Sequence, residues 1–324
     1  MITLLLDPLK FRSYTGIMKY LNVCMMKKTL ILSLVLSVVT VGLTAQTKPA
    51  LDNLYAQQKD AVVMVSQAIY LDSTRVEHVD IIRQIEKGLG FPILDTYLRL
   101  AHGSAFFISS DGYAITNEHC VKPLTRDMKR FHALVAFVNT GMRHLAPGYA
   151  SQRDIRRVSD ALLEYAENEP VVLLLATADR KEYIAEVFSQ NQKDDLALLK
   201  ITLDEKKPII HLGEAPALRE GQDVYSIGYP NQLYTDYHTE DIQATLTSGI
   251  VSALRSEHWD IQHTAALNYG NSGGPLFRQD GTLVGVNSGL QTNKVTTYYY
   301  AVGIDKLITW LTDIGQTHLV GGQQ

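Results

Sequence analysis

The sequence has very little cysteine, because its 324 residues contain only Cys24 and Cys120. Cys24 precedes a segment with the pattern of an export signal, so the processed chain would keep Cys120 alone and form no internal disulfide. A single thiol also cannot complete the cysteine set of a structural zinc site. We therefore expect stability to come from buried apolar side chains, for which a hydrophobic fraction of 46% is ample.

An excess of charge of either sign is also missing. The chain has 30 basic and 34 acidic residues, a formal net charge of -4, and both signs are scattered along it. Nucleic-acid binding requires a basic stripe, so we expect no nucleic-acid partner. The sequence likewise shows no internal repeat, no low-complexity tract and no long Pro/Gly linker, which favours an ordinary globular protein.

The apolar run at residues 29–43 is shorter than the roughly 20 residues of a membrane-spanning helix. Two lysines precede this run and a small residue, Ala45, follows it, which predicts a signal peptide cleaved after Ala45. Residues 1–45 would then be a presequence and signal, and the mature protein, without a stable membrane span, would lie in the periplasm or be secreted. We interpret residues 1–24 as the product of an over-extended start codon, and an uncleaved anchor is the alternative.

Short segments rich in β-branched and aromatic residues recur along the chain between turn signals. The predicted strands cover residues 61–70, 103–108, 113–116, 171–175, 183–188, 196–201, 223–227, 243–251, 283–286 and 298–302. Apolar residues at helical spacing predict helical insertions at 79–89 and 151–168, the second starting at a capping box of Ser151 and Asp154, and a C-terminal helix at 304–314. This pattern predicts an all-β fold, built either as paired β-barrels or as a sandwich.

One serine lies among three glycines, in the segment Gly-Asn-Ser-Gly-Gly-Pro at residues 270–275. Glycines let the backbone bend sharply and present both the Ser272 hydroxyl and neighbouring N–H groups. A serine becomes a nucleophile when a base takes its proton, and the resulting oxyanion needs donors, here the N–H groups of Gly270 and Ser272. The segment indicates acyl transfer, and a glycine-rich surface turn is the alternative.

The histidine that best suits the role of base is His119, because it directly follows the predicted hairpin at residues 103–116. The remaining candidates lie in contexts without such a signal: His102, His132, His144 and His211. For the acid that orients the base we choose Asp195, at the start of a predicted strand, with Asp194 as the near alternative. Histidine, aspartate and serine then follow one another at strand edges, far enough apart for separate loops to bring them together.

Four stretches together resemble the chymotrypsin-like serine proteases, and among them the protease domain of the bacterial HtrA/Deg family. They are residues 103–119, 195–200, 247–252, and 268–276 with 284–288. The resemblance covers about residues 55–315, interrupted by the two helical insertions. It implies a chymotrypsin-like double β-barrel with helical insertions and a C-terminal helix, the N-terminal barrel lying within residues 46–205 and the C-terminal barrel within 206–324.

The resemblance also implies the site. The family's catalytic triad falls on His119 as general base, Asp195 as its orienting carboxylate and Ser272 as nucleophile, with an oxyanion hole at the N–H groups of Gly270 and Ser272. It implies an exported serine endopeptidase that cleaves proteins or peptides through an acyl-enzyme, with no metal and no cofactor. A latent or chaperone-like protein that binds unfolded chains with little turnover is the alternative, and assembly into a homo-oligomer stays open.

A third function, acyl transfer on esters, is disfavoured because the strand-turn-helix pattern of a nucleophile elbow is absent around Ser272. Asn271 replaces an aspartate of the digestive relatives, so we expect no zymogen activation through a new N-terminus.

Cys120 stands where those relatives have a disulfide cysteine, but it lacks a partner, so we expect a buried small residue. About fifty residues follow Ser272, so we expect no PDZ domain, and we predict that the insertion at about 145–170 covers the cleft.

The resemblance locates the specificity pocket at Ala266, at Asn287 and Ser288, and at Tyr300. An uncharged floor with an aromatic wall favours small or medium apolar side chains and offers no partner to lysine or arginine. Recognition of an acidic side chain by His263 or Tyr300 is the alternative.

Overall fold

The computed structural model describes residues 50–90, 92–137, 151–215, 217–230, 243–255, 260–292 and 297–321. The predicted presequence and signal, residues 1–45, and the first part of the predicted cover lie outside these residues. Over the described ranges, no helix combines the length and the apolar character needed to cross a membrane.

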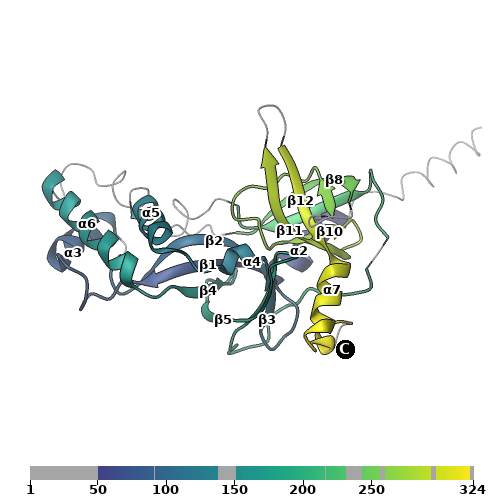
Figure 1. The fold of residues 1–324 in the computed structure, drawn as a ribbon, viewed down its shortest axis with the longest axis horizontal. Helices are drawn as coiled ribbons and strands as arrows, with labels where there is room; N and C mark the ends of the chain where they lie inside the picture. Colours follow the sequence, from purple (N-terminus) through teal and green to yellow (C-terminus); the bar gives the residue numbers. More distant parts are fainter. Residues whose placement is uncertain are drawn as a thin grey trace, which may run out of the picture. The chain divides into compact units, whose positions relative to one another are not determined.

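The first half of the chain forms a closed antiparallel barrel with the strand order β1-β2-β3-β6-β5-β4 (Figure 1). Its strands are β1 Val62–Tyr70, β2 Tyr97–Phe107, β3 Tyr113–Thr116, β4 Val172–Ala176, β5 Glu182–Asn191 and β6 Leu196–Lys200. The predicted hairpin is confirmed as β2 and β3. Its turn depends on Gly112, which has a φ of 101° and whose Cβ, if it had one, would lie 2.4 Å from the Ile201 carbonyl oxygen.

The second half forms another closed antiparallel barrel, with the order β10-β11-β12-β9-β8-β7. Its strands are β7 Asp223–Gly228, β8 Thr245–Leu254, β9 Ile261–His263, β10 Pro275–Arg278, β11 Leu283–Thr292 and β12 Thr297–Gly303. Two closed barrels confirm the predicted all-β, chymotrypsin-like double barrel, and the sandwich alternative is wrong. The sequence did not predict β9 and β10, which are only 3 and 4 residues long.

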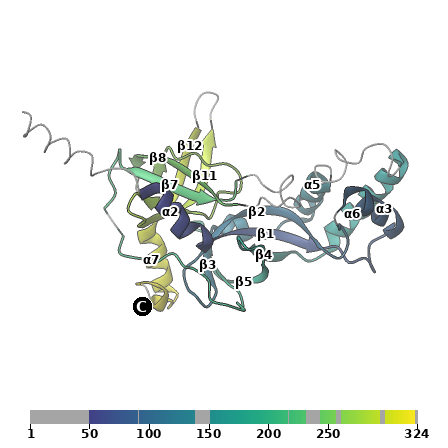
Figure 2. The same ribbon diagram turned by 180° about the vertical axis from the view of Figure 1, so that it is seen from behind.

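Helices decorate both barrels, and α3, α5 and α6 lie together at one end of the long β1–β2 pair (Figures 1 and 2). The helical segments are α2 Ala50–Gln58, η2 Lys59–Ala61, α3 Val79–Leu89, α4 Glu118–Val121, α5 Arg126–Phe137, α6 Gln152–Asn168, α7 Ile304–Asp313 and η4 Thr317–Leu319. The apolar spacing correctly predicted α3, α6 and α7. The predicted cap of α6 is also present, because the Ser151 hydroxyl accepts a hydrogen bond from the Asp154 N–H at 3.2 Å.

The apolar face of α6 belongs to a core of its own. Val158 and Leu162 of α6 are buried together with Ile82 of α3 and with Leu100 of β2. At about 1.5–3 kcal/mol for each fully buried large apolar side chain, this packing anchors the helices firmly on the β1–β2 pair.

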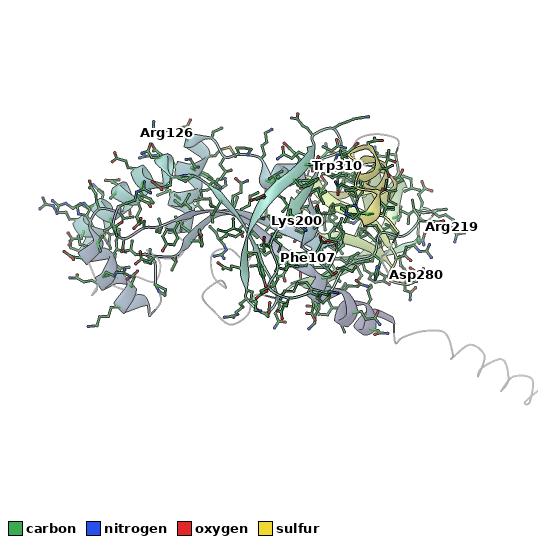
Figure 3. The ribbon with its side chains drawn as sticks, turned by 90° about the horizontal axis from the view of Figure 1, so that it is seen from below. Phe107, Arg126, Lys200, Arg219, Asp280 and Trp310 are labelled. Carbon is green, nitrogen blue, oxygen red and sulfur yellow. The ribbon has the colours of Figure 1, made fainter. Side chains whose placement is uncertain are left out.

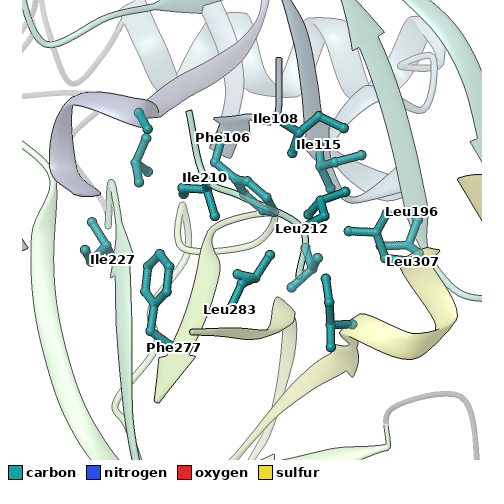
Figure 4. Close-up of a cluster of buried hydrophobic side chains, with 14 of the residues drawn as sticks. Phe106, Ile108, Ile115, Leu196, Ile210, Leu212, Ile227, Phe277, Leu283 and Leu307 are labelled. Atoms are coloured by element: carbon teal, nitrogen blue, oxygen red, sulfur yellow. The ribbon is translucent and has the colours of Figure 1, made fainter. Parts of the chain in front are cut away.

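A second apolar core joins the two barrels (Figure 4). Phe106 and Ile115 of the first barrel pack in one cluster with Ile227 and Phe277 of the second, and with Leu307 of α7. Charged side chains such as Arg126, Arg219 and Asp280 lie instead on the surface (Figure 3). The shared core fixes the two barrels against each other, which any site between them requires.

Candidate active site

His119 lies in α4, a single helical turn that begins directly after β3 ends at Thr116. Asn117 does not cap this helix with its side chain. Its amide group instead donates a hydrogen bond to the Asp195 carbonyl oxygen at 2.8 Å, which ties α4 to the start of β6. The His119 side chain remains 45% exposed, so a substrate can reach it.

Asp195 accepts hydrogen bonds from His119 at both carboxylate oxygens. His119 Nδ1 lies 2.8 Å from Oδ2 and 3.0 Å from Oδ1, and the His119 backbone N–H donates to Oδ1 at 3.1 Å. The φ of Asp195 is 53°, a left-handed conformation that aspartate tolerates better than most residues. The neighbouring Asp194 closes a local turn, where its N–H donates to the Asn191 side-chain oxygen at 3.1 Å. Asp195, and not Asp194, therefore contacts His119.

The second barrel adds a partner to this pair, because the Ser288 hydroxyl donates a short hydrogen bond to Asp195 Oδ2. Burial opposes the charge on Asp195, but the hydrogen bonds and charge of His119, with the bond from Ser288, outweigh it and hold the pKa of Asp195 below its ordinary value. Burial is the largest single influence on His119 and lowers its pKa, but the interactions with Asp195 and Cys120 together outweigh burial and raise the pKa above its ordinary value. His119 is thus a stronger base than a free imidazole.

Ser272 follows a tight turn at residues 268–271, closed by a hydrogen bond of 3.0 Å from the Asn271 N–H to the Asn268 carbonyl. Gly270, the third residue of this turn, has a φ of 99°, as a type II turn requires. The Ser272 hydroxyl donates to the Ser288 carbonyl oxygen at 2.9 Å. No hydrogen bond joins it to His119, although the structure describes both residues.

The N–H groups of Gly270 and Ser272 form no hydrogen bond with any other described residue. The carbonyl groups of the same residues are, in contrast, both satisfied by Ser104 of β2. Its hydroxyl donates to the Gly270 oxygen at 2.6 Å, and its N–H donates to the Ser272 oxygen at 2.7 Å. Two unused donors therefore flank the Ser272 hydroxyl, as an oxyanion hole requires.

An open cleft of about 340 Å³ lies over these groups. It is lined by His119, Leu267, Asn268, Tyr269, Ser272, Ser288, Gly289 and Leu290. Leu267, Leu290 and the 75% exposed Tyr269 give it apolar walls. No described residue of α6 lines this cleft, so the expectation that the helical insertion covers it is not met by the described residues.

The four residues predicted for the specificity pocket do not all lie at the cleft. Ser288 lines the cleft and Ala266 is exposed beside it, but Asn287 and Tyr300 are buried. The Asn287 amide group donates to the Ser226 hydroxyl at 2.8 Å and to the Gly274 carbonyl at 3.1 Å, so it holds in place the backbone that follows Ser272. The substrate-binding roles of these residues stay predictions.

Two other histidines, one buried and one half-buried, have pKa values far below the ordinary value. His263 is 1% exposed, and burial lowers its pKa to about 4, so its ring is neutral at pH 7 and does not line the cleft. This argues against His263 as a cationic partner for an acidic side chain. Burial also lowers the pKa of His102 to about 4, and a Cβ on Gly270 would lie 2.4 Å from its Nε2, a close approach that the sequence did not suggest.

Metal-binding geometry is absent from the described part of the chain, where no three His, Cys, Asp or Glu side chains are arranged to hold an ion. Cys120 is half-buried, with its sulfur 3.7 Å from the Ser272 carbonyl oxygen.

Comparison with known proteins places this geometry in a family. A profile described as "Trypsin-like peptidase domain" matches residues 103–286, which is more than half of the chain. The chain belongs to the trypsin-like peptidase family. This family assignment agrees with the double barrel, and the matched region contains His119, Asp195 and Ser272.

Within this family, the chain is similar to proteins named HTRA and DegP-like. It is 34% identical over 200 residues to a "Probable periplasmic serine endoprotease DegP-like" of Marinomonas sp. (strain MWYL1), covering 60% of this chain and 31% of that protein. It is 28% identical over 240 residues to "Serine protease HTRA1" of Xenopus tropicalis, covering 74% and 40%, and 29% identical over 231 residues to "Serine protease HTRA3" of Homo sapiens, covering 71% and 41%. The resemblance to HtrA/Deg proteases is confirmed, although the chain spans less than half the length of these relatives.

Proposed function

We propose that the chain is an exported serine endopeptidase that hydrolyses peptide bonds through His119, Asp195 and Ser272. The observation that carries the proposal is the 2.8 Å pairing of His119 with Asp195 at the edge of a cleft that also contains Ser272. The relative named as a probable periplasmic serine endoprotease supports both the activity and export.

The reaction begins when a substrate carbonyl enters the cleft above Ser272. The Ser272 hydroxyl leaves the Ser288 oxygen by rotating about χ1 and donates to His119 Nε2, while His119 Nδ1–H remains bonded to Asp195. His119 takes the hydroxyl proton as Ser272 Oγ attacks the carbonyl carbon. The negative charge that develops on the carbonyl oxygen is then stabilised by the N–H groups of Gly270 and Ser272.

The tetrahedral intermediate collapses when His119 returns its proton to the leaving amine, so the peptide bond breaks and an acyl-enzyme remains on Ser272. Water, deprotonated by His119, attacks the ester and releases the acid, and the proton returns to Ser272. Asp195 stays ionised throughout and stabilises the imidazolium form of His119, which agrees with its lowered pKa.

For specificity we propose a preference for small or medium apolar residues before the cleaved bond. The cleft walls are Leu267, Leu290 and Tyr269, and His119 is the only titratable side chain besides Tyr269 among the described lining residues. A lysine, arginine or glutamate side chain would lose its hydration there without gaining a partner.

The experiment is digestion of casein and of a peptide series that differs only in the residue before the cleaved bond. The wild-type chain and the matched control Ser252→Ala, which changes an exposed serine of β8, are expected to cleave alanine, valine and leucine peptides best. Ser272→Ala is expected to cleave none. Equal cleavage by Ser272→Ala would contradict the nucleophile, and a preference for lysine would contradict the apolar pocket.

A latent or chaperone-like protein is the second candidate, and the hydrogen bond of the Ser272 hydroxyl to Ser288 rather than to His119 favours it. Under this alternative, the wild type and Ser272→Ala would suppress aggregation of an unfolded protein equally well. The wild type would also release no peptides in the same assay. Peptide release by the wild type would exclude this candidate as the main function.

A further inference from the structure

Ser104 is a completely buried residue of β2 that contacts Gly270 and Ser272, which belong to the other half of the chain. Its hydroxyl donates to the Gly270 oxygen at 2.6 Å and accepts from the Tyr229 N–H at 2.9 Å. Its backbone N–H donates to the Ser272 oxygen at 2.7 Å. One residue of the first barrel thus holds three backbone groups of the second.

The same residue also connects to the segment that positions the base. The Thr116 hydroxyl donates to the Ser104 carbonyl oxygen at 2.7 Å, and Thr116 is the last residue of β3 before the turn that carries His119. A continuous line of hydrogen bonds therefore runs from the base segment through Ser104 to the peptide groups on either side of the nucleophile.

Packing around Ser104 leaves little freedom for another arrangement. A Cβ on Gly273 would lie 2.1 Å from the Ser104 oxygen, and one on Gly228 would lie 2.9 Å from its hydroxyl oxygen. Glycines on both sides let the backbones approach Ser104 this closely. The hydroxyl uses its donor and one lone pair on backbone groups, so it has a fixed orientation.

We propose that Ser104 is a positioning residue for catalysis: it sets the place of the two oxyanion donors, Gly270 N–H and Ser272 N–H, relative to His119. Ser104 bonds the carbonyl groups of these two residues and leaves their N–H groups free for substrate. The inference rests on the proposed function, because it concerns how well the same site stabilises a transition state.

The expected consequence is specific to the chemical step. Catalytic groups must be held to within a fraction of an ångström, and a displacement of 1 Å costs about 100-fold in rate. Loss of the Ser104 hydroxyl releases Gly270 and Tyr229 but touches no residue that lines the cleft. Substrate binding is therefore retained while the rate of acylation falls.

The test compares Ser104→Ala with Ser66→Ala, using kcat and KM for an apolar peptide substrate. Ser66 lies on the adjacent strand β1 and is equally buried, and its hydroxyl has no hydrogen-bond partner within the described ranges, so it controls for removal of a buried hydroxyl. Active sites are counted by prolonged labelling with a fluorophosphonate. Per active site, Ser104→Ala is expected to lose about 10- to 100-fold in kcat with KM within about twofold, and Ser66→Ala to match the wild type.

A wild-type kcat in folded Ser104→Ala, or a raised KM with unchanged kcat, would overturn the inference while leaving the proposed function intact. If Ser104→Ala does not fold, Thr116→Val is tested in its place. This substitution removes the hydrogen bond from the Thr116 hydroxyl to the Ser104 carbonyl and changes the shape of the side chain little. A smaller loss of kcat supports the inference, and a wild-type kcat overturns it. A wild-type chain that neither labels nor cleaves would instead overturn the proposed function and this inference with it.

Discussion

The two halves of the candidate site differ in how completely their hydrogen bonds are made. On the acid–base side, Asp195 accepts two hydrogen bonds from His119 and one from Ser288. On the nucleophile side, the Ser272 hydroxyl donates to Ser288 and not to His119, and the flanking N–H groups have no partner among the residues that the structure describes. The hydrogen bonds of the acid–base pair are already made, whereas the two N–H groups that would receive the oxyanion are left unused, as preorganised transition-state binding requires.

Removing the base, His119, is expected to have the largest effect on the acid–base side of the candidate site. His119→Ala is expected to lower kcat by about 10⁶-fold, because the Ser272 hydroxyl then has no group to take its proton. His132→Ala, which removes a half-buried histidine of α5, is the matched control and should keep wild-type kcat. Steady-state hydrolysis of an apolar peptide measures both, and comparable losses in the two variants would contradict the assignment of the base.

Removing the charge of the acid is the next largest effect. Asp195→Asn is expected to lower kcat by about 10⁴-fold, because an amide can donate to His119 Nδ1 and favours the wrong tautomer. Asp194→Asn changes the adjacent carboxylate, which accepts a hydrogen bond from the Asn191 amide group and none from His119, and should stay near the wild-type rate. A larger loss in Asp194→Asn would show that the two roles are reversed.

The acid limb of the pH–rate profile tests whether Asp195 raises the pKa of His119. His119 must be neutral to accept a proton, and its pKa is raised, so kcat/KM should fall on acidification through a pKa above the ordinary histidine value. In Asp195→Asn the raising interaction is lost, so the limb should move to lower pH. A limb that stays in place in this variant would show that Asp195 does not set the basicity of His119.

Ser288 tests the link between the halves, because its hydroxyl bonds Asp195 while its carbonyl receives the Ser272 hydroxyl. Ser288→Ala removes only the first of these contacts. A hydrogen bond to a charged group contributes about 1.5 kcal/mol, so kcat should fall by about 10-fold, with Ser252→Ala as the exposed control. An unchanged kcat would mean that His119 alone orients Asp195.

The smallest effect on activity is expected from the helical insertion, despite a large effect on stability. Leu162→Ala empties a buried position between α6, α3 and β2, and should lower the free energy of unfolding in urea by about 2–5 kcal/mol. Because no described residue of α6 lines the cleft, kcat/KM of the folded protein should stay within about twofold. A change in kcat/KM as large as that of Ser288→Ala would instead support the hypothesis that the helical insertion covers the cleft.

Most of the fold could be predicted where local patterns are long. The 17 residues of α6, with a capped start and a regular apolar face, were found from spacing alone. The helix α5 was missed because Met128 and Phe131 are exposed on it, which blurs its apolar periodicity. Ion pairs from Arg126 and Arg130 to Glu167 of α6 help to hold it instead, and such pairs leave no readable period.

The residues of the candidate site also differ in whether the sequence alone could predict them. His119, Asp195 and Ser272 could be singled out because each lies in a distinctive local motif. The role of Ser104 depends on the Gly270 carbonyl, 166 residues away, and that of Asn117 on the Asp195 carbonyl, 78 residues away. Backbone carbonyls have no sequence signature, so contacts to them emerge only when the folded chain brings distant strands together, within the first barrel for Asn117 and between the two barrels for Ser104.

The central claim, an activated nucleophile at Ser272, is tested most directly by labelling the purified chain with a fluorophosphonate probe and locating the modified residue by mass spectrometry. The account predicts that the wild type is labelled at Ser272, that labelling slows on acidification as His119 becomes protonated, and that Ser272→Ala is not labelled. Labelling of Ser272→Ala at the wild-type rate, or at another serine in both proteins, would contradict the account.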